Sequence, residues 1–287
     1  MPVALITGAA VGFGRGLARV FGRAGHSLVL IDVRDELEAT ADEISGTGVD
    51  VLAIRGDVTD DALLRTVVDQ TIETFGSIDV LINNAGQVRF SPSDLPLETA
   101  ITHLEELWRV NTRAPYVLGR LVIPHMIAAE SGHIINIATD HIHTCGFPTV
   151  LSHEGAEACA WSDSPRRPLG PGPFDAYDSS KWALNGFTQN WAHELRKYGI
   201  RVNNICLGAT DSEMMREAVL HGRGRPATQS EVDSWMPTEQ VADIVRQLHD
   251  EGPNGRTGDN VGIWLGHPIV LPPVHEVLGR TGGPDVK

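Results

Sequence analysis

The strongest hint of chemistry in this sequence is the stretch FDAYDSSKWALNGF, in which Tyr177 precedes Lys181 by four residues. On a helix, residues at this spacing lie on one face about one turn apart, so the phenol and the ammonium would be neighbours. A phenol with a pKa of ~10 becomes a base near neutral pH only if its anion is stabilised by about 4 kcal/mol, and one positive charge at ~4 Å supplies roughly that much. An isolated Tyr–Lys pair is more often an ordinary contact on a helix surface. The pair therefore predicts proton transfer only if the chain also provides a cofactor and a pocket.

A glycine-rich turn near the N-terminus has the composition of a phosphate-binding loop. The turn TGAAVGFG covers residues 7–14 and lies between an apolar, strand-like segment and a helix-like segment. Its glycines are Gly8, Gly12 and Gly14. Glycines let the backbone approach a pyrophosphate closely, and the N-terminus of the following helix offers unpaired N–H groups and the positive end of its dipole. The turn therefore predicts that the chain binds a dinucleotide.

An acidic residue ends the next predicted strand. Asp32 follows Gly8 by 24 residues, close to the roughly 20 expected for a carboxylate that hydrogen-bonds the ribose diol of a dinucleotide. A carboxylate at this place would repel a 2′-phosphate. The sequence therefore favours NAD over NADP, with Arg34 as a nearby residue that argues the other way. The alternative for Asp32 is that it only caps the strand.

Strand-like and helix-like segments alternate along the chain. The predicted strands are residues 3–7, 28–32, 51–54, 79–86 with its closing turn, 133–139, 200–206 and 260–265. The predicted helices are residues 12–24, 34–44, 59–75, 98–129 and a helix that begins near residue 177. Such alternation is typical of a parallel sheet covered by helices on both faces. We therefore predict an α/β, Rossmann-like, doubly wound parallel sheet that forms a single domain over residues 1–287.

The composition restricts where the protein works and what it binds. Of 287 residues, 41% are hydrophobic and 21% are charged, which are ordinary values for a globular protein. The formal net charge of −14 argues against nucleic acid and against an anionic membrane surface, because both attract basic proteins. The apolar runs are of strand length, no secretory signal is visible, and the three cysteines form neither a CxxC pair nor an even framework. We expect a cytoplasmic protein with a small-molecule substrate.

Three motifs in this order resemble the short-chain dehydrogenase/reductase family. They are TGxxxGxG at residues 7–14, NNAG at residues 83–86 and YxxxK at residues 177–181. Each motif is loose by itself, but the three together in the right order are specific. The resemblance covers nearly the whole chain, from residue 3 to about residue 266. It implies an NAD-dependent enzyme that transfers a hydride between the cofactor and a secondary alcohol or ketone.

The resemblance also implies roles for individual residues. The implied catalytic residues are Asn111, Thr139, Tyr177 and Lys181. The implied cofactor-binding residues are Gly8, Gly12, Phe13, Gly14, Asp32, Asp57, Val58, Asn83, Ala85, Gly86, Tyr177, Lys181, Gly208, Thr210 and Ser212. Among them, Asp57 would meet the adenine ring, Asn111 would hold a water in a proton relay, and Lys181 would hold the nicotinamide ribose. The turn at residues 206–212 departs from the family, because Leu207 replaces the expected proline and Ser212 stands where threonine is usual.

The position at which the family has a serine carries Thr139, at the end of a predicted strand. A threonine keeps a hydroxyl that can donate to and accept from a substrate oxygen, while its methyl group narrows the site. We therefore expect Thr139 to replace the serine, the alternative being that it is only a strand-end residue. Asp140 and His141 are neighbouring candidates for the same contact.

A second departure is the length of the segment between Thr139 and Tyr177, which are 38 residues apart. The extra residues, 141–175, are rich in glycine and proline, which predicts an inserted loop or lid near the substrate mouth. Its aromatic residues, which could wall a pocket, are Phe147, Trp161 and Phe174. Its potential metal ligands are His141, His143, Cys145 and His153. Because hydride transfer requires no metal and the HxHxC spacing alone establishes no zinc geometry, we predict no metal site.

Arginines are clustered in two segments that could reach the substrate. Arg166 and Arg167 lie in the insertion, and Arg223 and Arg225 lie in residues 208–236, where the family usually places a substrate loop. Converging arginines could hold a carboxylate or a sulfonate through paired hydrogen bonds. The alternative, which we favour, is that they are solvated loop charges.

The leading function is therefore an oxidoreductase that acts on NAD(H) and a small, cyclic or aromatic secondary alcohol or ketone. One alternative is a dehydrogenase for a hydroxy compound that bears a carboxylate or a sulfonate. Another is a non-catalytic NAD-binding regulatory protein, which the intact Asn111, Tyr177 and Lys181 argue against. Members of the family are commonly dimers or tetramers, so we expect a homodimer or homotetramer.

Overall fold

A sheet of parallel strands forms the centre of the protein in the computed structural model, which describes residues 1–142, 173–263 and 269–272. Within these residues the sheet has seven strands, in the order β3-β2-β1-β4-β5-β6-β7. The strands are β1 (Val3–Thr7), β2 (Ser27–Asp32), β3 (Val51–Arg55), β4 (Val80–Asn83), β5 (Gly132–Thr139), β6 (Ile200–Leu207) and β7 (Asn260–Ile263). Each neighbouring pair is parallel. The predicted parallel α/β sheet is confirmed.

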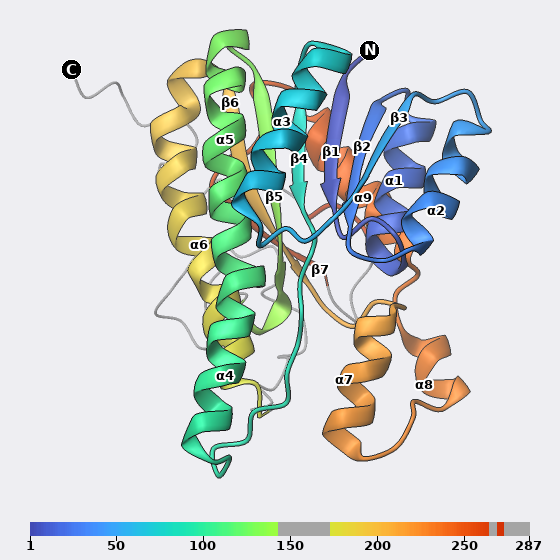
Figure 1. The fold of residues 1–287 in the computed structure, drawn as a ribbon, viewed down its shortest axis with the longest axis vertical. Helices are drawn as coiled ribbons and strands as arrows, with labels where there is room; N and C mark the ends of the chain where they lie inside the picture. Colours follow the sequence, from blue (N-terminus) through green and yellow to red (C-terminus); the bar gives the residue numbers. More distant parts are fainter. Residues whose placement is uncertain (143–172, 264–268, 273–287) are drawn as a thin grey trace.

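Helices cover both faces of this sheet (Figure 1). They are α1 (Gly12–Arg23), α2 (Glu36–Ser45), α3 (Asp61–Phe75), α4 (Leu97–Trp108), α5 (Ala114–Ala129), α6 (Asp175–Leu195), α7 (Glu213–Arg223), α8 (Gln229–Ser234) and α9 (Thr238–Asp250). On one face, α1, α2 and α9 bury an apolar cluster that includes Phe21 and Val245. On the other, α3, α5 and α6 bury a second cluster that includes Val122 and Trp191. Burial on both faces explains why the strands are continuously apolar.

The structure differs from the predicted elements in three places. The predicted helix over residues 98–129 is interrupted by a π-helical turn, η1 (Arg109–Arg113). The segment 208–236, predicted as a substrate loop, contains the helices α7 and α8. Helix α9 was not predicted, although Val241, Val245 and Leu248 recur at helical spacing and are all buried. The last two residues of the predicted strand 260–265 lie outside the described residues.

The strand order reverses between β1 and β4. From β1 the chain continues to its neighbour β2, and from β4 it continues to β5 on the opposite side. In an open α/β sheet, ligands bind beyond the carboxyl ends of the strands at such a point. The glycine-rich turn follows β1 and the NNAG motif follows β4, so both motifs lie at this point.

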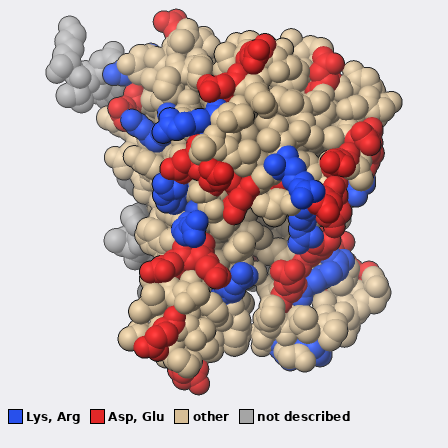
Figure 2. All heavy atoms as spheres, in the orientation of Figure 1, with Lys and Arg blue, Asp and Glu red and all other residues tan. Residues whose placement is uncertain are grey.

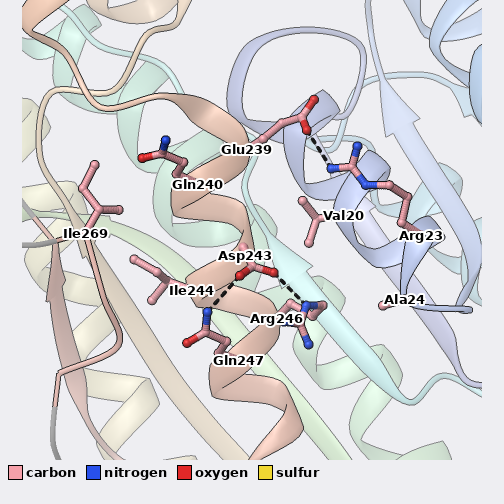
Figure 3. Close-up of a pocket in the computed structure, with 10 residues that line it drawn as sticks. All are labelled: Val20, Arg23, Ala24, Glu239, Gln240, Asp243, Ile244, Arg246, Gln247 and Ile269. Carbon is pink, nitrogen blue, oxygen red and sulfur yellow. Dashed lines mark hydrogen bonds and ion pairs between the residues drawn. The ribbon is translucent and has the colours of Figure 1, made fainter.

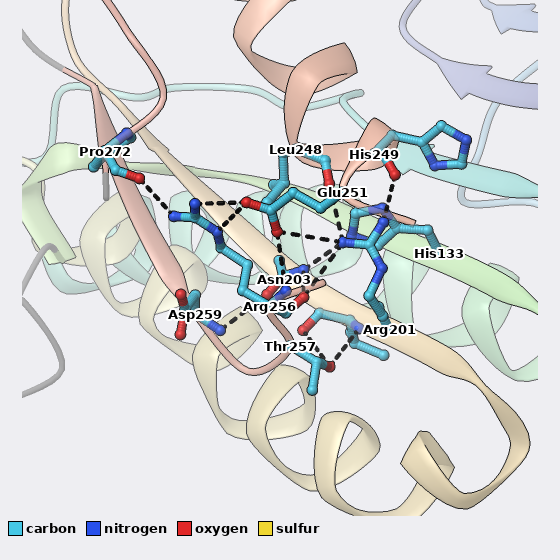
Figure 4. Close-up of polar contacts among 11 residues, drawn as sticks. His133, Arg201, Asn203, Leu248, His249, Glu251, Arg256, Thr257, Asp259 and Pro272 are labelled. Carbon is cyan, nitrogen blue, oxygen red and sulfur yellow. Dashed lines mark hydrogen bonds and ion pairs between the residues drawn. The ribbon is translucent and has the colours of Figure 1, made fainter. Parts of the chain in front are cut away.

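The opposite end of the sheet is closed by buried arginines (Figure 4). Arg201 on β6 is 3% exposed and donates to the main-chain oxygens of Leu248 and His249 at 2.9 and 2.6 Å. These oxygens belong to the last turn of α9, and the carbonyl groups of a last turn have no hydrogen-bond donors within the helix. Arg256 donates to the main-chain oxygen of Pro272 at 2.8 Å and thereby holds residues 269–272 against the sheet.

Candidate active site

A cavity of about 840 Å³ opens at the carboxyl ends of the strands. Its lining includes the last residues of three strands, Asp32 of β2, Thr139 of β5 and Leu207 of β6, together with the glycine-rich turn. Its volume lies within the range of small-molecule and cofactor pockets. In the space-filling view the surface is notched between α4 and α7, and acidic and basic side chains are interspersed over this face (Figure 2).

Two glycines bring the first turn against the turn after β4. Gly8 has a φ of 67°, and a Cβ on it would lie 2.8 Å from the Cα of Ala85. A Cβ on Gly14 would lie only 1.8 Å from the main-chain oxygen of Gly8. The hydroxyl of Thr7 accepts hydrogen bonds from the N–H groups of Asn84 and Ala85, both at 3.0 Å. The two turns are therefore held in contact by backbone, which leaves no space for larger residues.

The N-terminus of α1 lies inside the cavity without a side-chain cap. The N-cap residue is Val11, whose side chain makes no capping hydrogen bond. The first N–H groups of a helix have no partners within the helix, and they attract an anion together with the helix dipole. Gly12, Phe13 and Gly14 at this terminus all line the cavity. The site therefore fits a pyrophosphate group.

Asp32 is fixed by the backbone around it. One of its carboxylate oxygens accepts from the N–H of Ala10 at 2.9 Å and the other from the N–H of Arg34 at 3.1 Å. A carboxylate offers about four acceptor positions, so acceptors remain for a ribose diol. The guanidinium of Arg34 forms an ion pair with Glu213, the first residue of α7. The Asp32 carboxylate thus lines the cavity, whereas the Arg34 guanidinium is paired with Glu213.

Three of the four predicted catalytic residues, Thr139, Tyr177 and Lys181, line the far end of the cavity, where Thr139 is 4% exposed. Burial raises the pKa of Tyr177 to about 12; the nearby Thr139 hydroxyl opposes this rise, and the neighbouring Asp178 carboxylate adds to it. Burial lowers the pKa of Lys181 to about 8, and its Nζ atom donates to the main-chain oxygen of Ile137 at 2.7 Å. Burial therefore disfavours the charged form of both the phenol and the ammonium.

Asn111 lies behind the cavity and not in its wall. It is fully buried in the π-helical turn η1, a feature that often marks functional sites. Its amide nitrogen donates to the main-chain oxygen of Gln87 at 2.9 Å and to the hydroxyl of Ser180 at 3.0 Å, while its oxygen accepts from the N–H of Gln87 at 2.8 Å. Asn111 thus ties the turn after β4 to the helix that carries Tyr177. Its role in holding a water stays a prediction.

Almost all of the predicted cofactor-binding residues line the cavity. They are Gly8, Gly12, Phe13, Gly14, Asp32, Asp57, Val58, Ala85, Gly86, Tyr177, Lys181, Gly208, Thr210 and Ser212. Asn83 is not among them, because it is buried and its amide donates to Asn136 at 2.8 Å. The cavity is lined instead by Asn84, whose amide holds the main-chain oxygens of Thr7 and Gly8. Successive side chains of a strand point to opposite faces, and the motif alone does not say which asparagine faces the ligand.

The substrate end of the cavity has apolar walls. Phe90 and Phe174 pack edge to face with their ring centroids 6.0 Å apart, and Met214 and Met215 contribute from α7. Arg223 also lines this end. Arg223 and Arg225 both pair with Glu231, whose single carboxylate compensates one of their two positive charges.

Several predicted features of the insertion lie outside the described residues. They are the aromatic residues Phe147 and Trp161, the arginines Arg166 and Arg167, and the potential ligands His143, Cys145 and His153. In the described part of the chain, no group of three or more His, Cys, Asp or Glu side chains is arranged to hold a metal ion.

A second groove lies between α1 and α9 (Figure 3). Its charged side chains pair with one another, for example Arg23 with Glu239 at 2.6 Å and Arg246 with Asp243 at 2.9 Å. Ion pairs of this kind at a surface contribute little and leave no charge free for a ligand. We assign no site to this groove.

A sequence profile described as short chain dehydrogenase matches residues 2–145 and 170–221, which include all four predicted catalytic residues. The chain belongs to the short-chain dehydrogenase family. As a short-chain dehydrogenase it is an oxidoreductase with a nicotinamide cofactor. Among its relatives, the oxidoreductase UcpA of Salmonella typhimurium is 35% identical over 212 residues, which are 74% of this chain and 70% of the relative. The 3-oxoacyl-[acyl-carrier-protein] reductase FabG of Thermotoga maritima is 27% identical over 266 residues, which are 91% of this chain and 95% of the relative.

Solved structures of short-chain dehydrogenases share this fold. Levodione reductase matches with a TM-score of 0.75 at 26% identity, over 91% of this chain and 95% of that one. A metagenomic short-chain oxidoreductase in complex with NADP matches with a TM-score of 0.68 at 26% identity, over 93% and 97%. The predicted single-domain Rossmann-like fold is confirmed. None of the helices in the described residues combines the length and apolar character needed to cross a membrane.

Proposed function

We propose that the protein is an NAD-dependent dehydrogenase that interconverts a small secondary alcohol and its ketone. The observation that carries this proposal is that Thr139, Tyr177 and Lys181 line the same cavity as the glycine-rich turn. These three groups supply a general base, a hydroxyl that orients the substrate oxygen, and a positive charge.

Each residue of the site has a separate role in the proposed reaction. When bound, the oxidised cofactor supplies the hydride acceptor. Tyr177 takes the proton from the substrate hydroxyl, and the Thr139 hydroxyl holds the same substrate oxygen. Lys181 stabilises the phenolate through its charge. The backbone N–H groups at the start of α1 hold the pyrophosphate, and the carboxylate of Asp32 accepts from the adenosine ribose.

The electrostatics at the adenosine end support NAD over NADP. The Asp32 carboxylate is oriented by two backbone N–H groups and would repel a 2′-phosphate. Arg34, which could attract that phosphate, is paired with Glu213. The apolar walls at the other end support a small cyclic or aromatic substrate.

Steady-state kinetics with NAD and NADP on a panel of secondary alcohols tests the proposal. We expect NAD to be preferred, and Tyr177→Phe to lower kcat by about 100-fold or more while the Kd for NAD changes little. Glu213→Gln frees Arg34 and should move the preference toward NADP. The matched control Glu43→Gln frees Arg15 and removes one of the two carboxylates that pair with Arg19. Neither arginine lines the cavity, so the preference should stay as it is.

Two outcomes would contradict the proposal in different ways. Preference of the wild type for NADP would overturn the assignment of Asp32. Tight NAD binding without turnover across the panel would favour the non-catalytic, regulatory alternative.

We further propose that the protein forms a homodimer or homotetramer through α4, α5 and α6; α4 and α5 follow each other end to end, and α6 runs beside them (Figure 1). Large apolar side chains on these helices are between 41% and 67% exposed: Leu97, Ile101, Leu104, Trp108, Tyr116 and Trp182. Contiguous exposed apolar surface usually marks an interaction site. Light scattering should give a multiple of the chain mass, and the double substitution of Trp108→Glu and Trp182→Glu should reduce it to the monomer. A monomeric wild type would refute the proposal.

A further inference from the structure

His141 lines the cavity and lies two residues after Thr139, the last residue of β5. The short helical turn η2 (Asp140–Ile142) follows β5 without a break, and His141 lines the cavity together with Tyr177 and Phe174. The His141 ring stands edge-on to the Tyr177 ring, with centroids 6.4 Å apart, and lies 6.2 Å from the Phe174 ring. The histidine is therefore a neighbour of the reacting groups, although the dehydrogenase chemistry proposed above does not use it.

The orientation of this ring is set by Asp178. The Nδ1 atom of His141 lies 2.8 Å from Oδ1 of Asp178, which is next to Tyr177 in the first turn of α6. Their side chains are 25% and 32% exposed, so the pair is partly shielded from solvent. The contact joins two residues that are far apart in sequence and adjacent to Thr139 and Tyr177. The His141–Asp178 pair is thus held in register with the catalytic hydroxyls.

The carboxylate also selects the tautomer of the ring. An ionised carboxylate only accepts hydrogen bonds, so Nδ1 carries the proton that lies between them. In the neutral ring the other nitrogen, Nε2, then presents a lone pair and acts as an acceptor. A fixed acceptor recognises a donor, and the donor that a substrate of this reaction most simply offers is a second hydroxyl.

We propose that His141, oriented by Asp178, is a specificity-determining residue that accepts a hydrogen bond from a hydroxyl next to the reacting carbon. The preferred substrates are then vicinal diols and the corresponding α-hydroxy ketones. This inference rests on the proposed function, because it needs a substrate oxygen between Thr139 and Tyr177. An anionic group is disfavoured at the same place, since it would face an acceptor nitrogen and the carboxylate of Asp178.

Matched substrate pairs test the inference. The kcat/KM values are measured for butane-2,3-diol against butan-2-ol and for cyclohexane-1,2-diol against cyclohexanol, at saturating NAD. We expect the wild type to favour the diol of each pair, and His141→Asn to lower the diol-to-alcohol ratio by about tenfold, the equivalent of one hydrogen bond. An asparagine amide still reaches Asp178 from the position of Nδ1 but has no atom at the position of Nε2.

Two further variants distinguish recognition of the second hydroxyl from a general structural effect of the substitution. Asp178→Asn removes the group that selects the tautomer and should also lower the ratio. His193→Asn changes an exposed histidine at the other end of α6 and should leave the ratio unchanged. The melting temperature of each variant shows whether it is folded.

The outcomes distinguish this inference from the function on which it rests. A wild type that oxidises alcohols without preferring diols overturns the role of His141 and leaves the proposed function standing. A His141→Asn variant that loses the same factor on both members of each pair also overturns it, since the residue would then only position the site. A wild type that binds NAD but oxidises neither member of any pair overturns both.

Discussion

Lys181 lies one helical turn after Tyr177, yet its ammonium donates its hydrogen bond to the main-chain oxygen of Ile137, at 2.7 Å. Ile137 belongs to β5, so the lysine joins helix α6 to the strand that ends in Thr139. Burial lowers the pKa of Lys181 to about 8 and raises that of Tyr177 to about 12. Without cofactor the phenol is therefore protonated at neutral pH, and the lowered pKa that the sequence predicts requires the charge of the oxidised nicotinamide as well.

Because the phenol of Tyr177 needs a further positive charge to become a base, we predict that binding of the oxidised cofactor lowers its pKa. A positive charge at ~4 Å should lower it by about 2 to 3 units. The ultraviolet absorbance of tyrosinate, recorded against pH for the wild type minus Tyr177→Phe, isolates this group from the other two of the three tyrosines. NADH is the control, because it has nearly the same shape without the positive ring. Equal shifts with the two forms would rule out the charge as the cause.

The buried ammonium of Lys181 should lower the free energy of unfolding, and removing its charge should raise that free energy again. Its folded pKa lies below its unfolded value, so the unfolded chain binds more protons between pH 8 and about 10.5, and stability rises with pH across that window. At neutral pH the penalty is about 3 kcal/mol. Lys181→Met should abolish turnover but raise the free energy of unfolding by about 1 to 2 kcal/mol, since the lost hydrogen bond offsets part of the gain. Urea unfolding measures it, with the exposed Lys197→Met as the control; a less stable Lys181→Met would refute the prediction.

Two glycine substitutions should have opposite effects. In Gly14→Ala the new Cβ would lie 1.8 Å from the Gly8 oxygen, so we expect a loss of about 2 kcal/mol or more and much weaker NAD binding. In Gly186→Ala the new Cβ has no neighbour within 4 Å and lies inside helix α6, so we expect a gain of up to about 1 kcal/mol. Thermal unfolding and NAD titration of both variants check this. Equal effects would mean that backbone packing at the turn is not the cause.

A cluster of three histidines, two of them buried and His249 half-buried, should make the protein sensitive to acid. His26, His133 and His249 lie in contact at the end of the sheet opposite the active site, with ring centroids 5.4 and 5.6 Å apart, and Figure 4 shows the last two beside Arg201. Burial lowers the pKa of all three, that of His249 to about 4. The unfolded chain therefore binds more protons, and stability is lost as pH falls from about 6.5 through about 4.

Urea unfolding at ~pH 7.5 and ~pH 5 tests this sensitivity. His249→Phe keeps an aromatic ring but cannot be protonated, so its loss of stability between the two pH values should be about 1 to 2 kcal/mol smaller than that of the wild type. The exposed His193→Asn should behave like the wild type. An unchanged pH dependence in His249→Phe would exclude this histidine as a source.

Local patterns in the sequence determined a large part of this protein. Strand alternation with helices predicted the parallel sheet, because burial on both faces leaves a continuous apolar run in each strand. The glycine-rich turn, Asp32 and the Tyr177–Lys181 pair were predictable because each depends on neighbours within one strand end or one helical turn. Helix α9 was equally local and was missed, although its apolar spacing was present.

Only the tertiary structure decided how these parts meet. Whether Asn83 or Asn84 lines the cavity depends on how β4 packs in the sheet. The burial of Asn111 depends on a π-helical turn that no residue type in the sequence predicts. The pairing of Arg34 with Glu213 and that of His141 with Asp178 join residues far apart in the chain. Spacing in a sequence sets which side chains share an element, whereas the charge state and the partner of each one are set by burial and by the elements packed against it.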